Sequence, residues 1–153
     1  MSLNSVKQEL SIIAPDLQII EYKTSTASVY EAALAHKVEP CQIVKTLALM
    51  LKKPILLMVA GNVKIDNKKF KTYFRKKAKM LSPEDTEKFT SHPVGGVCPF
   101  GLPAKLDIYA DKSLDLHDFV IPAAGSPNSS VIIKKERLVE VVSARKVDVT
   151  VAI

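Results

Sequence analysis

The feature that most constrains the fold of this 153-residue chain is a loop dense in glycine and proline at residues 95–103. Three of the chain's five glycines and two of its nine prolines lie in this stretch, GGVCPFGLP. Neither a helix interior nor a central strand tolerates that density. Glycine lets another group come close to the backbone, and proline fixes the chain path between such points. The pattern predicts a stiff loop with exposed N–H groups, which either binds an oxyanion or phosphate oxygen or serves only as a tight turn.

Length and composition favour one globular domain over residues 1–153. Hydrophobic residues make up 47% of the chain, and this length can bury a full core. The longest apolar run, residues 55–60, is far shorter than the roughly 18–20 residues of a membrane span, and the N-terminal residues lack the pattern of a signal peptide. Cys41 and Cys98 give neither a disulfide framework nor metal-ligand spacing. We therefore expect a cytoplasmic protein with free thiols, no membrane association and no bound metal.

The positive charge of the chain is concentrated in one segment. Eight basic residues and a single acid, Asp66, give residues 64–79 a net charge of +7, against +6 for the whole chain. Such a patch favours a polyanionic partner, because each neutralised phosphate releases counterions. The alternatives are a solvated helix face and a docking site for an acidic protein. The basic residues are Lys64, Lys68, Lys69, Lys71, Arg75, Lys76, Lys77 and Lys79.

The spacing of apolar residues predicts an α+β domain with a curled, mixed β-sheet. Helices are expected at residues 3–14, 29–36, 66–77, 82–89 and within 134–142, and strands at 17–22, 43–51, 54–60, 106–109, 118–122, 130–133 and 147–153. Ser28 and Glu31 form a capping-box pattern at the start of the second helix. In the third helix, Phe70, Tyr73 and Phe74 are expected to face inward and most lysines outward. Strands and helices follow one another without regular alternation, which favours a mixed sheet.

Two residues could carry chemistry by type and position. Lys45 lies within the apolar run IVKTLAL, where a charge is costly unless it reaches water or an anion. It either occupies the polar face of an edge strand or points into a ligand pocket. Cys98 could be a nucleophile if a base such as His92 were close, but a small loop residue is the simpler interpretation. The three histidines show no ligand spacing, so a zinc site is not expected.

Several segments together resemble the YbaK/EbsC family, which is similar to the editing insertion domain of bacterial prolyl-tRNA synthetase. The lysine strand CQIVKTLAL and the loop GGVCPFGL carry most of the resemblance, with Gly95 and Pro99 at the family's G-x-x-x-P spacing. The match spans roughly residues 5–150. The supporting segments are TSTASVYEAAL, PILLMVAG, IDNKKFKTYF and AAGSPNSS followed by VII.

The resemblance implies a trans-acting aminoacyl-tRNA deacylase, which hydrolyses the ester joining a wrong amino acid to tRNA. It implies a partly open barrel flanked by helices, no cofactor, and transient association with an aminoacyl-tRNA synthetase. Alanine or cysteine on tRNA-Pro is the first expected substrate, followed by serine or threonine. Family members usually have serine where this chain has Cys98, and often a hydroxyl residue where it has Ala123. The first departure argues against a required nucleophile, and the second points to a different substrate.

The family pattern assigns site residues by position. Oxyanion stabilisation is expected from the N–H groups of residues 96–98, and Lys45 is expected to hold the phosphate or ribose of the terminal adenosine. The expected catalytic set is Lys45, Gly95, Gly96, Val97, Cys98 and Pro99. The expected substrate-binding set is Thr24, Thr26, Phe100, Gly101, Ala124, Gly125 and Ser126. The expected tRNA-binding set is Lys64, Lys68, Lys69, Arg75, Lys76 and Lys77. The alternatives are a non-catalytic tRNA- or nucleotide-binding module and a protein-interaction module that uses the lysine patch.

Overall fold

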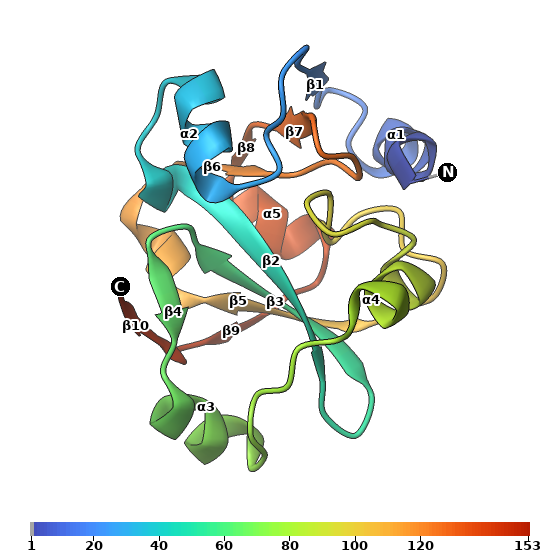
Figure 1. The fold of residues 1–153 in the computed structure, drawn as a ribbon. Helices are drawn as coiled ribbons and strands as arrows, with labels where there is room; N and C mark the ends of the chain where they lie inside the picture. Colours follow the sequence, from blue (N-terminus) through green and yellow to red (C-terminus); the bar gives the residue numbers. More distant parts are fainter. Residues whose placement is uncertain (1) are drawn as a thin grey trace.

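A curled six-stranded sheet organises the computed structural model, which describes residues 2–153 (Figure 1). The strand order is β8-β6-β2-β3-β5-β9. β2 and β3 form an antiparallel hairpin, β6 pairs with β8 antiparallel, and the other three pairings are parallel. The bounds are β2 Ile43–Met50, β3 Pro54–Ala60, β5 Asp107–Asp111, β6 Phe119–Pro122, β8 Ile133–Lys134 and β9 Arg145–Val147. The mixed α+β class with a curled sheet is therefore confirmed.

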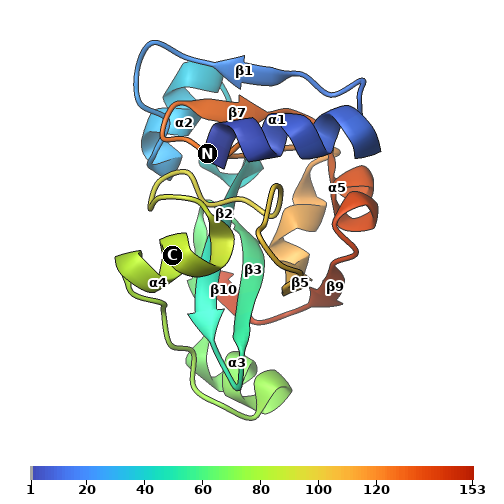
Figure 2. The ribbon, with the colours of Figure 1, turned by 90° about the vertical axis from the view of Figure 1, so that its right-hand side faces the viewer.

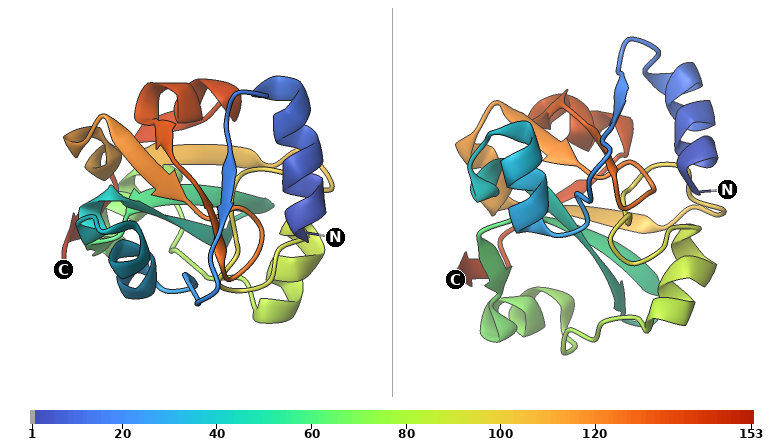
Figure 3. Two further views of the ribbon diagram at one scale, coloured as in Figure 1. Left: turned by 90° about the horizontal axis from the view of Figure 1, so that it is seen from above. Right: turned by 45° about the horizontal axis from the view of Figure 1, so that its top comes forward.

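Two small antiparallel sheets extend the main one. β1 (Ile19–Glu21) pairs with β7 (Ser129–Val131), and β4 (Val63–Ile65) pairs with β10 (Thr150–Ala152). Seen from above, α1, α2 and α5 surround the first of these sheets (Figure 3). In the side view α1, β1 and β7 lie at one end of the molecule and α3 at the other (Figure 2).

The helices begin where capping residues predict. The Ser28 hydroxyl accepts the Glu31 N–H, and the Glu31 carboxylate accepts the Ser28 N–H, so the expected capping box is present. Asp66 and Ser82 cap the next two helices through their side-chain oxygens alone, which accept N–H groups of the first turn. The helices are α1 Ser2–Ile13, α2 Val29–His36, α3 Asn67–Phe74, α4 Pro83–Thr90 and α5 Lys135–Val141, with short 3₁₀ turns η1 Pro40–Gln42 and η2 Lys112–Leu116.

Three element boundaries and the orientation of one side chain differ from the sequence-based expectations. α3 ends at Phe74 rather than at residue 77, because Arg75 adopts a left-handed backbone with φ of 63°. The expected strand at 147–153 is instead β9 and β10, which belong to different sheets, and the one at 130–133 divides into β7 and β8. Tyr73, expected inward, is 50% exposed, whereas Phe70 on the same helix is fully buried.

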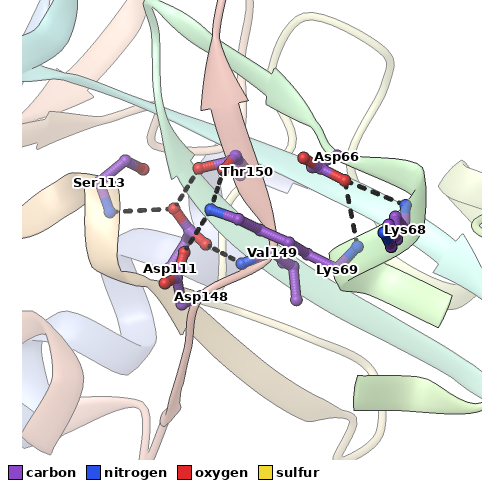
Figure 4. A network of polar contacts seen from close by, with 8 residues as sticks. All are labelled: Asp66, Lys68, Lys69, Asp111, Ser113, Asp148, Val149 and Thr150. Carbon is purple, nitrogen blue, oxygen red and sulfur yellow. Dashed lines mark hydrogen bonds and ion pairs between the residues drawn. The ribbon is translucent and has the colours of Figure 1, made fainter. Parts of the chain in front are cut away.

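A buried carboxylate explains why the chain changes sheets near its C-terminus. Asp111, at the end of β5, accepts hydrogen bonds from the Ser113 N–H at 2.9 Å, the Val149 N–H at 2.8 Å and the Thr150 hydroxyl at 2.6 Å (Figure 4). Both carboxylate oxygens are thereby used, so the charge can be buried without loss of hydrogen bonding. The bonds to residues 149 and 150 draw the chain away from β9 and toward β4.

Candidate active site

A cavity of about 400 Å³ opens beside the central strand β2. Its walls come from four places: the N-terminal end of α2, the segment leading into α4, the glycine loop, and the end of β6. Most lining side chains are apolar, with a few hydroxyl groups and Lys45 among them. Such a hollow, apolar with few polar groups, is the usual form of a small-molecule site.

One edge of β2 is open where it borders this cavity. β6 pairs with β2 only at Ile43 and Val44. Farther along, the segment at residues 79–81 bonds to the same edge, through Leu81 N–H to the Ala48 carbonyl at 3.0 Å and Met50 N–H to the Lys79 carbonyl at 2.8 Å. Residues 45–47 lie between these two pairings, and no strand of the described chain covers their outer edge.

The glycine loop forms the facing wall through Gly95 and Val97. Gly95 has φ of +93°, which favours glycine. A Cβ on Gly96 would lie 2.8 Å from the Ser126 nitrogen, and the Gly125 N–H donates to the Gly96 carbonyl at 3.1 Å. The two glycine-containing turns of the sequence therefore pack backbone to backbone, and the absence of a side chain at Gly96 has a structural reason.

The hydrogen bonds of the loop narrow the set of oxyanion donors. The Gly96 N–H donates to the Pro93 carbonyl at 2.9 Å, so it is already used inside the loop. This differs from the expectation that Gly96 contributes a donor. The N–H groups of Val97 and Cys98 make no backbone hydrogen bond within residues 2–153 and remain as candidates.

Cys98 lies behind the loop and not in the cavity. Its side chain is fully buried, and its Sγ is 3.5 Å from His92 Nε2 and 3.7 Å from the Phe100 carbonyl oxygen. Burial raises the pKa of the Cys98 thiol to about 12. A thiol with that pKa is a poor nucleophile, so the structure favours the small-loop-residue interpretation.

His92 connects the loop to the N-terminal helix. Its Nε2–H donates to the Phe100 carbonyl at 2.6 Å, and its Nδ1 lies 2.5 Å from the hydroxyl oxygen of Ser2, whose own proton is donated to the Gly125 carbonyl. Burial lowers the pKa of His92 below its usual value, although the bond to Phe100 opposes the shift. His92 is therefore a structural link between the loop and α1.

Lys45 is on the cavity wall, as the resemblance implied, but its ammonium is held by the fold. Nζ donates to the Val63 carbonyl of β4 at 2.9 Å. The side chain is half-buried, and burial lowers the pKa of Lys45 below its usual value. The charge lies between β2 and β4 at the margin of the cavity.

The other expected substrate-binding residues divide into three groups. Thr26 lines the cavity. Gly125 and Ser126 line a separate hollow beside the N-terminal end of α1. The remaining substrate-binding residues are not among those that line the cavity: Thr24, Phe100, Gly101 and Ala124. The expected catalytic residue Pro99 does not line it either. Phe100 and Ala124 are fully buried, and the α-position of Gly101 packs against the α1 backbone.

The sequence of residues 23–141 matches the family model described as the aminoacyl-tRNA editing domain. The chain belongs to this family. It is 39% identical to the uncharacterized protein YwhH of Bacillus subtilis over 142 residues, which are 92% of this chain and 90% of that protein. It is also 31% identical over 94 residues to the proline–tRNA ligase of Limosilactobacillus fermentum, covering 57% of this chain and 16% of the ligase.

Solved structures agree with the family assignment. The crystal structure of a proposed trans-editing enzyme for prolyl-tRNA synthetase superposes with a TM-score of 0.91 and 27% identity, covering 99% of this chain and 98% of that one. The hypothetical protein APE2540, with a TM-score of 0.87 and 23% identity over 96% of this chain and 99% of that one, shares the fold.

Two features of this editing domain are not indicated by its sequence. The Thr46 hydroxyl is buried and has no hydrogen-bond partner among residues 2–153. Met80, in the segment before α4, forms part of the cavity rim. No sequence signal marks either residue, because their roles depend on which strands lie beside β2.

The lysine patch of the editing domain begins with Lys64 on β4 and continues on and after α3. Its side chains are mostly exposed, and residues 75–79 lead directly to Met80 on the cavity rim. Lys69 differs from the others, because its ammonium bonds to the Asp148 carboxylate at 3.1 Å and to the Thr150 carbonyl at 2.9 Å (Figure 4). The structure therefore uses Lys69 to fix α3 against β10.

Across residues 2–153, no three His, Cys, Asp or Glu side chains are grouped closely enough to hold a metal ion. None of the helices in this range has the length and apolar character needed to span a membrane.

Proposed function

We propose that this editing domain is an aminoacyl-tRNA deacylase that hydrolyses the ester of mischarged tRNA. The observation that carries the proposal is the cavity between the glycine loop and the open edge of β2, in a chain that matches the editing-domain family over residues 23–141. An aminoacyl ester is already reactive, so such a site needs to position water and stabilise charge rather than supply a strong nucleophile.

In this mechanism a water molecule adds to the ester carbonyl carbon, and the carbonyl oxygen becomes an oxyanion. The N–H group of Val97, which lines the cavity, is the proposed donor to that oxyanion. The C–O bond to the ribose then breaks, and the proton released by the attacking water passes to the ribose oxygen. Lys45 holds the phosphate or ribose of the terminal adenosine, and no cofactor takes part.

The proposed substrate is a small amino acid on tRNA-Pro, with alanine and cysteine first. The similarity to proline–tRNA ligases and to a proposed trans-editing enzyme for prolyl-tRNA synthetase supports this choice. The protein would act in the cytoplasm, in transient association with the synthetase.

The exposed part of the lysine patch is the proposed contact to the tRNA backbone. It leads from α3 to Met80 on the cavity rim, so a tRNA whose 3′ end enters the cavity would cross it. Lysines bind phosphate as point charges, without reading sequence.

A panel of mischarged tRNAs tests the proposed activity. Purified protein is incubated with alanyl-, cysteinyl-, seryl- and threonyl-tRNA-Pro, with correctly charged prolyl-tRNA as control, and the remaining aminoacyl-tRNA is measured over time. We expect at least one small amino acid to be released well above the spontaneous rate. If every ester decays at that rate while tRNA still binds, the protein is a non-catalytic tRNA-binding module.

A further inference from the structure

The open edge of β2 leaves one residue without main-chain hydrogen-bond partners within residues 2–153. Backbone direction alternates along a strand, so every second residue points its N–H and C=O to the same side. Ala48 and Met50 point theirs to the outer side, because they bond to the segment at residues 79–81. Thr46 therefore also points its N–H and C=O outward, at the place where no strand within residues 2–153 pairs with β2.

The side chain of the same residue is also unsatisfied. The Thr46 hydroxyl oxygen is buried and has no hydrogen-bond partner in the described chain. Buried polar groups are normally paired, so an unpaired one beside a cavity calls for a ligand or water. Three polar groups of Thr46, which belongs to the cavity lining, thus lack partners in the part of the chain that the structure describes.

We propose that the main chain of Thr46 binds the aminoacyl group as if it were one residue of an added strand. An aminoacyl ester contains the nitrogen, α-carbon and carbonyl of a single residue, and a strand residue is recognised through its N–H and C=O. The Thr46 carbonyl accepts a hydrogen bond from the α-ammonium, and its N–H donates to the ester carbonyl oxygen. This inference rests on the proposed function and specifies how the substrate is recognised.

This arrangement makes the α-ammonium a recognised feature of the substrate. Main-chain contacts do not depend on the identity of the amino acid side chain, so the added-strand contact accepts several small amino acids alike. An acyl group without a donor at the α-position would leave the Thr46 carbonyl unpaired and lose affinity.

Binding of non-hydrolysable analogues tests the inference independently of turnover. The probes are 3′-deoxyadenosine carrying an L-alanylamino group at the 3′ position, and the same compound with propionylamino, which lacks only the α-ammonium. We expect the alanyl compound to bind at least tenfold more tightly by calorimetry, and to shift the Thr46 amide signal in nitrogen-15 NMR spectra. Equal affinities, or an unchanged Thr46 amide signal with bound ligand, would overturn the inference.

Two variants separate the main chain from the side chain. Thr46→Val removes the hydroxyl and keeps both main-chain groups, so it should retain the alanyl preference. Thr46→Pro removes the N–H, which bonds to no strand, and should weaken both ligands if circular dichroism shows an intact fold. If alanyl-tRNA is hydrolysed but the two analogues bind equally, this inference fails and the proposed function stands. If the alanyl preference is found without any hydrolysis, the proposed function fails and this inference stands.

Discussion

The buried thiol of Cys98 allows a sharp test of the proposed chemistry. Burial raises its pKa from 9.0 to about 12, and its side chain is inaccessible to solvent. That difference lowers the thiolate fraction near neutral pH by about 1,000-fold relative to an ordinary cysteine, because each pKa unit is a tenfold change. If loop N–H groups rather than the thiol carry the reaction, Cys98→Ser should keep kcat/KM within about threefold of wild type.

Two measurements check this expectation. The first is deacylation by Cys98→Ser, with Cys98→Ala as a second variant that avoids a buried hydroxyl. The second is labelling with N-ethylmaleimide followed by peptide mass spectrometry, in which the partly exposed Cys41 is the internal control. Cys41 should label at least about 100-fold faster than Cys98. A trapped acyl-thioester on Cys98, or complete loss of turnover in a folded Cys98→Ser, would refute the reasoning and make the thiol the nucleophile.

Four further predictions follow from the same geometry. Lys45→Met should lower kcat/KM by about 100-fold and should lower Tm slightly, because the Val63 carbonyl loses its Nζ donor, whereas wild-type turnover would make Lys45 structural. Gly96→Ala should lower the free energy of unfolding by about 1–3 kcal/mol in urea titrations, because its Cβ would meet the backbone at 2.8 Å. Because the pKa of His92 is lowered in the folded protein, the unfolded chain binds more protons than the folded one below about pH 6.5. The Tm of wild type should therefore fall between pH 7.5 and pH 5, and the Tm of His92→Gln should fall less. Replacing four exposed lysines with glutamine should reduce the slope of log affinity for tRNA against log salt concentration by about 0.7–0.9 for each lost phosphate contact. Single-turnover hydrolysis should stay unchanged. An unaltered slope would place tRNA on another face. The four positions are Lys68, Lys71, Lys76 and Lys77.

Features with local physical causes were predictable from the sequence. The Ser28–Glu31 capping box is confirmed, and the strands expected at 43–51 and 54–60 are confirmed within a residue, because capping and strand formation here depend on near neighbours in the chain. The early end of α3 was not predictable, since Arg75 adopts a left-handed backbone without the glycine that normally marks it. The division of the last strand depends on Asp111, a residue distant in sequence from Val149 and Thr150.

The candidate site was likewise only partly predictable from the sequence. The resemblance predicted that Lys45 and the glycine loop share a site, and both line the cavity. The sequence could not show that the Gly96 N–H is used inside the loop, because that depends on how the turn closes onto Pro93. The open edge at Thr46 was equally hidden, since it exists only where the pairing with β6 ends and the pairing with the segment before α4 has not begun.

The lysine patch shows why a charge count along the chain overstates the charge available to a partner. Eight basic residues stand against one acid in the sequence of residues 64–79, but Lys69 is paired with Asp148, which lies 79 positions later in the chain. The lysines of this segment that form no ion pair within residues 2–153 lie on β4, on α3 and on the segment that leads to the cavity rim. The proposed phosphate contacts and the proposed ester site therefore occupy adjoining but separate surfaces. Salt screens exposed charges far more than groups inside a cavity. Ionic strength should therefore change tRNA affinity while the hydrolysis of bound substrate stays nearly constant, which is the separation expected of a domain that binds tRNA by charge and recognises the aminoacyl group by its main-chain atoms.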